Sequence, residues 1–266
     1  MMNLLLFLEN KIKNKFNNLI DILNSSIINS YGYKWNVVLI NEYPKCGASW
    51  LRNILSETLG INKNRGNWNK YRIMGIVGRN SIIQRHWKLK VNCRTIIMLR
   101  DPRDVMVSFY FFEKFFLKNF SLINNYSDGS KFKIEEEIEQ YIRVKTENST
   151  LSTPGFNYID FWNFYKNNND VMFIKYEDLK KDTFNVVKKA LNYIENTNVS
   201  NITIEKVIKE NNIHKMKKKD KRNEGFYRKG IIGDWQNYFT DNAKDYFKLK
   251  YSNMLVEMGY EKDNNW

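Results

Sequence analysis

Four short runs rich in Val and Ile alternate with longer stretches of helical periodicity along this chain. The runs cover residues 35–43, 81–86, 94–100 and 171–177, and each has the length and the β-branched content of a strand. Strands that alternate with helices pair in parallel, because each return of the chain passes through a helix that covers one face of the sheet. The sequence therefore predicts an α/β fold with one central parallel sheet flanked by helices on both faces. The stretches expected to be helical are 49–59, 102–118, 134–147, 157–167, 178–195, 203–211 and 241–258.

The 266 residues suffice for one domain with a sizeable core, and we place that domain at 35–266. Before it, segment 1–34 carries apolar side chains at helical spacing: Ile12, Phe16, Leu19, Leu23 and Ile27. Such an amphipathic helix packs on its own domain or makes a weak contact with a membrane surface, here through residues 4–28. The apolar run at 4–8 is shorter than a membrane span or the core of a signal peptide, so we expect a cytoplasmic protein.

The net charge of +14 favours anionic partners, among them nucleotides, nucleic acids, acidic glycans and membrane surfaces. Lysines recur in loops and helices alike, so the charge alone identifies no ligand. A hydrophobic content of 42% excludes a disordered chain. Cys46 and Cys93 cannot form a framework of several disulfides, and no spacing of metal ligands is present.

The segment YPKCGASWL at 43–51 follows the first expected strand of the domain and opens its first helix. Anions bind at this place in α/β folds, outside the carboxyl end of a strand and against the N–H groups of a helix start. Gly47 lets the backbone fold tightly around an anion, and Lys45 adds a mobile cation. A Walker loop has two glycines followed by Lys-Ser or Lys-Thr, whereas here the lysine precedes the glycine. The loop is therefore P-loop-like, but it disfavours an ordinary ATP or GTP site.

Two further segments carry cations suited to a phosphate. In IIMLRDPRDVMVSFYFF, at 96–112, Arg100 ends an expected strand just before a capped aromatic helix. In RKGIIGDWQNYFT, at 228–240, Arg228 offers a planar fork that matches phosphate oxygens, and Lys229 offers a point charge.

These segments together resemble the cytosolic-type sulfotransferases, which use 3′-phosphoadenosine 5′-phosphosulfate (PAPS). The family's phosphosulfate loop Tyr-Pro-Lys-Ser-Gly-Thr-Thr-Trp, its 3′-phosphate segment and its Arg-Lys-Gly-x-x-Gly-Asp-Trp signature have counterparts here in the same order. KYEDLKKD at 175–182 is similar to its Tyr-Glu-Asp segment, and the resemblance covers most of residues 36–259. It implies a sulfuryl-transferring enzyme that releases adenosine 3′,5′-bisphosphate (PAP) and needs no metal. The residues that it places at the nucleotide are Lys45, Cys46, Gly47, Ala48, Ser49 and Trp50 in the loop, Arg100, Ser108, Arg228, Lys229 and Gly230 at the 3′ phosphate, and Tyr176 near the adenine.

Some positions depart from the family pattern. Two loop hydroxyls are lost, because Cys46 and Ala48 stand where the family has Ser and Thr, while Ser49 keeps one hydroxyl. Segment 211–213 reads Asn-Asn-Ile and lacks the Phe that stacks on the adenine in the family. The family's dimer motif is not matched at 236–245, so the oligomeric state is left open.

An acceptor hydroxyl must lose its proton as it attacks sulfur, and an imidazole that titrates near neutrality suits this task. His214 lies in a basic loop, whereas His86 ends the second expected strand, at the same sheet edge as Lys45 and Arg100. His86 also resembles the family's base in a Lys-Thr-His strand end, although Gln84 replaces the lysine. We therefore expect His86 to be the base and Lys45 to meet the leaving oxygen.

A lowered thiol pKa is expected for Cys46, because the thiol lies beside Lys45 at a helix N-terminus. Two other functions are suggested by weaker features of the sequence. An ATP-dependent small-molecule kinase would need Mg²⁺ and a lysine after a second glycine. A nucleic-acid binder would use the basic run KMKKKDKR at 215–222, which is more simply a basic loop over the nucleotide or a solvated face, so we expect no nucleic-acid partner. The acceptor is expected to be a hydroxyl or amine of a small molecule, lipid or glycan, which the sequence does not identify.

Overall fold

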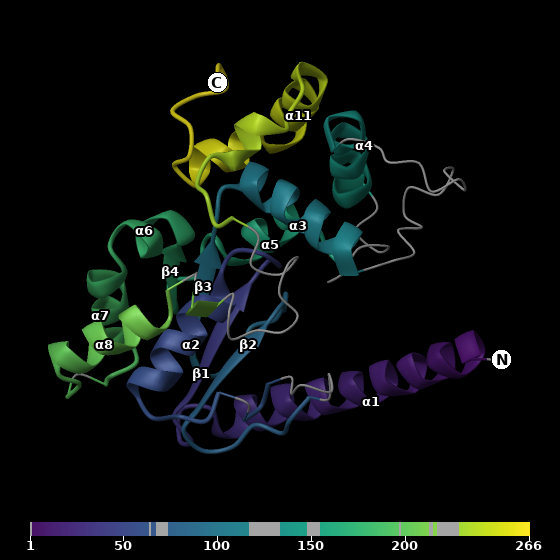
Figure 1. The fold of residues 1–266 in the computed structure, drawn as a ribbon. Helices are drawn as coiled ribbons and strands as arrows, with labels where there is room; N and C mark the ends of the chain where they lie inside the picture. Colours follow the sequence, from purple (N-terminus) through teal and green to yellow (C-terminus); the bar gives the residue numbers. More distant parts are fainter. Residues whose placement is uncertain are drawn as a thin grey trace.

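Four strands form one parallel sheet at the centre of the computed structural model: β1 (Val37–Glu42), β2 (Ser81–Arg85), β3 (Arg94–Leu99) and β4 (Val171–Lys175) (Figure 1). The order across the sheet is β2-β1-β3-β4, and every neighbouring pair is parallel. The predicted parallel sheet is therefore confirmed. The structure describes residues 2–63, 65–67, 74–116, 134–147, 155–196, 198–212, 215–216 and 229–266.

Helices cover both sides of the sheet, as predicted. Figure 1 shows α2, α7 and α8 grouped on one side, and α3, α4, α5 and α11 on the other. Their bounds are α2 (Ala48–Thr58), α3 (Pro102–Phe116), α4 (Ile134–Glu147), α5 (Tyr158–Tyr165), α6 (Tyr176–Lys181), α7 (Thr183–Tyr193), α8 (Asn201–Glu210) and α11 (Asp241–Glu257), with a short 3₁₀ helix η2 (Asp234–Asn237).

The stretch 178–195, predicted as one helix, contains the end of α6 and all of α7. Asp182 separates them, because its backbone is not helical (φ −142°, ψ 72°) and its side chain accepts a hydrogen bond from the N–H of Asn185. An Asp in this position starts a new helix, since its carboxylate satisfies a free N–H group of the first turn. The break makes α6 a short helix that begins directly after β4, at the edge of the sheet where the site lies.

The side chains of β1 alternate between two apolar clusters. Val38 and Ile40 belong to the main core, which also contains Leu51 of α2. Val37 and Leu39 pack in a smaller cluster with Ile28 and Ile83. Successive side chains of a strand point to opposite faces of the sheet, so the two clusters lie on opposite sides of β1. Ile28 comes from α1 (Met2–Tyr31), and this helix therefore contributes to the cover of the sheet at β1 and β2.

The face of α1 that packs on the domain is not its most apolar face. Its buried side chains include Asn17, Ile20 and Asn24. The asparagines are satisfied by the backbone of segment 74–77: Asn17 accepts from the N–H of Met74, and Asn24 both accepts from Val77 and donates to Gly75. Asparagines whose hydrogen bonds are satisfied by the backbone can therefore occupy the buried face of a helix, where apolar side chains are usually expected.

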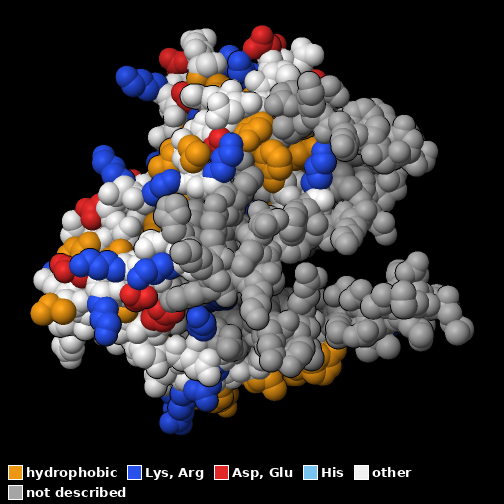
Figure 2. Space-filling model, viewed as in Figure 1, with side chains coloured by type: hydrophobic (Ala, Val, Ile, Leu, Met, Phe, Trp, Pro, Cys, Tyr) orange, Lys and Arg blue, Asp and Glu red, His pale blue; other side chains and the backbone are white. Residues whose placement is uncertain are grey.

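The middle of the predicted stripe lies on the outer side of α1, whereas Ile27 at its end packs against the smaller apolar cluster. Phe16, Leu19 and Leu23 are exposed, and Figure 2 shows apolar side chains gathered along the lower edge of the molecule, where α1 runs. No helix in the described ranges is both long and apolar enough to cross a membrane. The weak membrane contact through residues 4–28 and the division at residue 34 both stay predictions.

Candidate active site

The candidate site lies at the edge of the sheet where all four strands end. Glu42 is the last residue of β1, while His86, Arg100 and Tyr176 directly follow β2, β3 and β4. The strands are parallel, so their carboxyl ends lie at the same edge. The order reverses between β1 and β3, because β2 lies on one side of β1 and β3 on the other. Ligands of open α/β sheets bind outside such a switch point.

The glycine loop runs from the end of β1 to the start of α2. Lys45 (φ 78°) and Gly47 (φ 99°) both have left-handed backbone conformations. A Cβ atom on Gly47 would lie 2.7 Å from Cδ2 of Tyr176, so only glycine fits at this position. For a non-glycine residue such as Lys45, the left-handed conformation costs roughly 1–2 kcal/mol. Strain of this kind collects at binding sites, because the surrounding structure holds the loop in a shape that serves the ligand.

The side chain of Lys45 lies over α3. Its Nζ atom is 4.5 Å from the ring centroid of Phe112, and its backbone carbonyl accepts a hydrogen bond from Nη1 of Arg100 (3.4 Å). The loop is therefore joined to the residue that ends β3. The predicted catalytic role of Lys45 stays a prediction.

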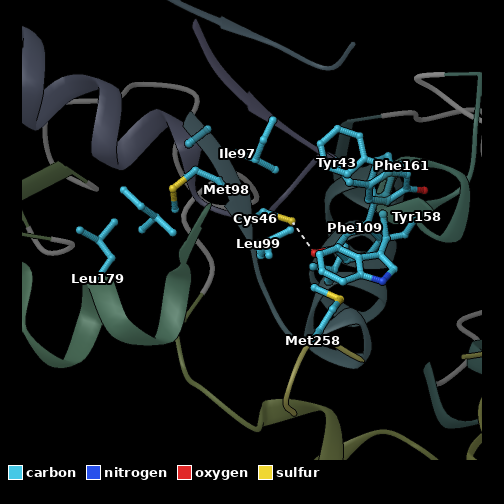
Figure 3. Packing of buried hydrophobic residues seen from close by; sticks show 14 of the residues in the cluster. Tyr43, Cys46, Ile97, Met98, Leu99, Phe109, Tyr158, Phe161, Leu179 and Met258 are labelled. Atoms are coloured by element: carbon cyan, nitrogen blue, oxygen red, sulfur yellow. Dashed lines mark hydrogen bonds between the residues drawn. The ribbon is translucent and has the colours of Figure 1, made fainter. Parts of the chain in front are cut away.

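The thiol of Cys46 points into the core and not toward the edge of the sheet. Cys46 is completely buried, and its Sγ atom donates to the Tyr158 hydroxyl at 3.4 Å (Figure 3). Burial raises the pKa of this thiol well above its usual value, and the charge of Glu42 raises it further. The expectation of a lowered pKa is therefore wrong, because desolvation of the thiolate outweighs the positive field of a helix start.

The start of α2 is bound to a buried carboxylate. Oε2 of Glu42 accepts from the N–H of Ala48 (2.9 Å), and Oε1 accepts from the side-chain amide of Gln84 (2.9 Å). The amide oxygen of Gln84 in turn accepts from the hydroxyl of Ser49 (2.9 Å). Gln84, which stands where the family has a lysine, thus connects the glycine loop to β2 without adding charge.

His86 lies beside this network. Its Nδ1 atom is 3.2 Å from the backbone oxygen of Glu42 and 4.0 Å from Oε1 of the same residue. Nδ1 can donate to that backbone oxygen, and in this tautomer Nε2 is unprotonated and can accept a proton. The His86 side chain is 37% exposed, which leaves it accessible to a substrate.

Arg100 lies at the centre of the other half of the site. Its guanidinium is 4.5 Å from the ring centroid of Tyr176 and 3.8 Å from a carboxylate oxygen of Asp104, and it donates to the carbonyl of Ile231 (3.2 Å). Its Nε atom is buried and has no hydrogen-bond partner among the described residues. Ser108, two turns into α3, is the one residue of 101–110 that is not buried.

Segment 229–235 lies against Arg100 and is held there by hydrogen bonds to its backbone. The carbonyl of Gly230 accepts from the hydroxyl of Tyr176 (3.1 Å) and from Nζ of Lys180. The carboxylate of Asp104 accepts from the N–H groups of Gly233 (2.8 Å) and Trp235 (2.9 Å), which fixes the segment to α3.

Lys229 is exposed, and its Nζ atom donates to the hydroxyl of Tyr238 (3.0 Å). Arg228 and His214 lie outside the described residues. At the predicted adenine side, Trp50 donates to the carbonyl of Asn211 (2.9 Å), and the rings of Trp50 and Tyr176 meet edge to face with centroids 6.1 Å apart. Trp50 therefore binds the backbone directly after α8 (Asn201–Glu210).

Sequence reasoning does not identify Asp104 and Lys180 as site residues. Asp104, in the first turn of α3, follows Arg100 by four positions, and Lys180 follows Tyr176 by four positions within α6. Residues four apart lie on one side of a helix, so helical spacing in α6 was the available signal for Lys180. Arg100 precedes α3, so the same signal did not apply to Asp104. Within the described part of the chain, no group of three or more His, Cys, Asp or Glu residues is arranged to hold a metal ion.

Comparisons with known proteins agree with this geometry. A sequence model of the sulfotransferase domain matches residues 80–259. The chain is 24% identical over 260 residues to sulfotransferase 1E1 of Rattus norvegicus, with 83% of each chain covered. It is 28% identical over 248 residues to sulfotransferase 2A2 of Mus musculus, with 80% of this chain and 82% of the relative covered.

Two solved structures have the same fold. Mouse sulfotransferase SULT7A1, complexed with PAP, superposes with a TM-score of 0.64 at 18% identity over 90% of this chain and 93% of that chain. Retinol dehydratase, in complex with androsterone and the inactive cofactor PAP, superposes with a TM-score of 0.63 at 14% identity over 88% and 84%.

Proposed function

Because the chain belongs to the sulfotransferase domain family, we propose that it transfers a sulfuryl group from PAPS to an acceptor, with His86 as base and Lys45 at the leaving oxygen. The observation that carries the proposal is the junction of three segments around Arg100. Its guanidinium donates to the glycine loop through the carbonyl of Lys45 and to segment 229–235 through the carbonyl of Ile231. The family's 5′ and 3′ phosphate segments thus converge on one arginine.

The 3′ phosphate of the nucleotide is proposed to bind Arg100, Ser108 and segment 228–230. Two facts support this role: the buried Nε of Arg100 has no hydrogen-bond partner among the described residues, and Ser108 is the one residue of 101–110 that is not buried. Side-chain cations that now donate to backbone carbonyls would donate to the phosphate instead, because a hydrogen bond between two charged groups is stronger than one to a neutral carbonyl. PAP is present in the solved structures of both neighbours named above, which supports PAPS as the donor.

Transfer is proposed to be in line. The acceptor oxygen attacks sulfur, a new O–S bond forms, and the bond from sulfur to the bridging phosphate oxygen breaks. The acceptor proton moves to Nε2 of His86, and PAP leaves with the electron pair on the bridging oxygen. Lys45 stabilises the negative charge that grows there, which lowers the barrier if the contact is stronger in the transition state than in the ground state.

The acceptor is proposed to be a hydroxyl, or an amine, of a small molecule, lipid or glycan. A neutral imidazole suits a hydroxyl acceptor, because the proton must be removed as the nucleophile attacks. Transfer of labelled sulfuryl from PAPS to a panel of phenols, alcohols, sugars and amines tests the proposal directly. Formation of PAP that depends on one acceptor class is the expected result.

A binding experiment separates the proposed function from its alternatives. Calorimetric titrations with PAP, ADP with Mg²⁺, and duplex DNA are expected to give tight binding for PAP alone. Binding that favours ADP with Mg²⁺ would indicate a kinase, and binding that favours DNA and weakens steeply with salt would indicate a nucleic-acid-binding protein. Either outcome would contradict the proposed function.

A further inference from the structure

We propose that Asp21, on the N-terminal helix α1, is a positioning residue that holds the strand end carrying His86. The inference rests on the proposed role of His86 as base. It gives α1 a part in the reaction, although this helix lies outside the segments that resemble the family.

The carboxylate of Asp21 bridges the two residues on either side of His86. Oδ1 of Asp21 accepts from Nε of Arg85 (2.6 Å), and Oδ2 accepts from Nε1 of Trp87 (2.6 Å). In an extended segment, side chains alternate between two sides. Binding of residues 85 and 87 on one side therefore directs His86 to the other side, where its Nδ1 atom lies 3.2 Å from the backbone oxygen of Glu42.

Asp21 also compensates a buried charge. Arg85 is only 3% exposed, and its other hydrogen bonds go to backbone carbonyls of Gly66 and Gln84 and to the Met74 sulfur. Asp21 is the carboxylate that pairs with this guanidinium among the described residues. A buried guanidinium without its carboxylate rearranges to regain hydration, and this disturbs the packing of the side chains around it.

Other bonds hold the backbone of Trp87 independently of α1. The side chain of Asn41 accepts from the N–H of Trp87 (2.8 Å) and donates to its carbonyl (2.8 Å). The hydroxyl of Tyr165 donates to the same carbonyl (3.1 Å). Loss of Asp21 is therefore expected to loosen the His86 side chain and to leave the strand itself in place.

The test compares Asp21→Ala with Asn24→Ala. Asn24 lies one turn further along α1 and also binds the domain, but its partners are the backbone of Gly75 and Val77, away from His86. Both variants weaken the attachment of α1, so both are expected to lower the Tm. Only Asp21→Ala is expected to lower kcat, by about tenfold, because small misplacements of a catalytic group are costly. The PAP affinity and the KM for PAPS are expected to change less than about threefold, because Asp21 has no part in the nucleotide site.

Combination with His86→Ala shows whether Asp21 acts through His86. If it does, Asp21→Ala causes no further loss of kcat in the His86→Ala background, because the group that it positions is gone. Trp87→Phe provides a milder variant that keeps an aromatic ring and the Arg85–Asp21 pair but removes the hydrogen bond from Nε1 to Asp21. A decrease in kcat of about threefold is expected for it.

Wild-type kcat in Asp21→Ala, an equal loss in Asn24→Ala, or an undiminished effect of Asp21→Ala on top of His86→Ala would each overturn the proposal. Full turnover of His86→Ala would refute the base assignment itself. An inactive His86→Ala together with a fully active Asp21→Ala would refute only the positioning role.

Discussion

The two ends of the candidate site are held together by different chemistry. At the phosphate end, cations bind backbone carbonyls: Arg100 donates to Ile231, and Lys180 donates to Gly230. At the base end, a carboxylate and an amide bind each other and the loop, with Glu42 as the central acceptor for Gln84 and for the backbone N–H of Ala48.

This difference indicates which end changes when the nucleotide binds. Phosphate oxygens compete well for guanidinium and ammonium donors, so the carbonyl contacts at the phosphate end can be exchanged for contacts with a ligand. The acceptor oxygens of Glu42 cannot bind an anion, and their bonds are expected to persist. We therefore expect a phosphate end that adapts to the nucleotide and a base end that is already in its working arrangement.

Replacement of His86 is the strongest test of the base end. His86→Ala is expected to reduce kcat by roughly 10²–10⁴ with a hydroxyl acceptor, because proton removal by a positioned base contributes about that much. PAP affinity, measured by calorimetry, is expected to stay within about threefold of the wild type, because the imidazole acts on the acceptor and not on the nucleotide. If turnover is unchanged while chemistry limits the rate, the base is another group, and Glu42 becomes the next candidate.

Lys45 tests the point where the two ends meet. Lys45→Ala is expected to lower kcat by about 10²–10³ and to change PAP affinity less, because the charge that Lys45 meets develops only in the transition state. Single-turnover kinetics with PAPS measures the chemical step. Lys244→Ala removes a lysine that pairs with the exposed Asp241 in the first turn of α11, and it serves as the control for net charge. Equal losses of kcat and of PAP affinity in Lys45→Ala would mean that Lys45 stabilises the bound nucleotide and the transition state to the same extent.

Two nearby arginines sharpen the comparison at the phosphate end. Arg100→Ala is expected to weaken PAP binding by about 10- to 150-fold, which corresponds to roughly 1.5–3 kcal/mol for a lost charged hydrogen bond. AMP lacks the 3′ phosphate, so its affinity is expected to change little. The measurement is a pair of calorimetric titrations, and an equal loss for PAP and AMP would place Arg100 elsewhere on the nucleotide.

Arg103 is the matched control. Its guanidinium binds Asp101 and Glu261 and also lies 4.2 Å from the ring centroid of Trp235 and 4.4 Å from that of Trp266. Arg103→Ala is expected to lower the free energy of unfolding by about 3 kcal/mol, because it leaves the buried carboxylate of Asp101 without its cation. Its effect on the ratio of PAP to AMP affinity is expected to be small.

The phosphate end could be predicted from the sequence to a large extent. Its residues lie in short segments in which strand, glycine and cation follow each other, so Arg100 and Gly230 come from contiguous motifs. The positions of strands and helices could also be predicted, because the spacing of apolar residues and the capping residues are local features of the sequence. The break at Asp182 was harder to predict, since apolar periodicity continues across it and only the side-chain cap divides α6 from α7.

The contacts at the base end could not be predicted from the sequence in this way. Asp21 and Arg85 are 64 positions apart, and Asn41 and Trp87 are 46 apart. No local pattern links such pairs, and the buried asparagines of α1 even run against the rule that apolar side chains mark the packed face. The thiol of Cys46 shows the same limit, because its direction depends on Tyr158, which lies 112 positions away.

Cys46 provides the prediction with the smallest effect. Its thiol faces Tyr158 and the core, away from the anion side of the loop, so Cys46→Ser is expected to change PAP affinity less than about threefold and to cost about 1 kcal/mol of unfolding free energy or less. The thiol is also expected to resist alkylation by iodoacetamide at pH 8, because burial raises its pKa well above the usual value and leaves little thiolate. Cys93 serves as the control, since burial raises its pKa to about 11. Both thiols are expected to react together when the protein is unfolded in urea, as followed by mass spectrometry. Rapid alkylation of Cys46 alone in the folded protein, blocked by PAP, would mean that the thiol faces the ligand and that the loop at the junction of the two ends has a different arrangement.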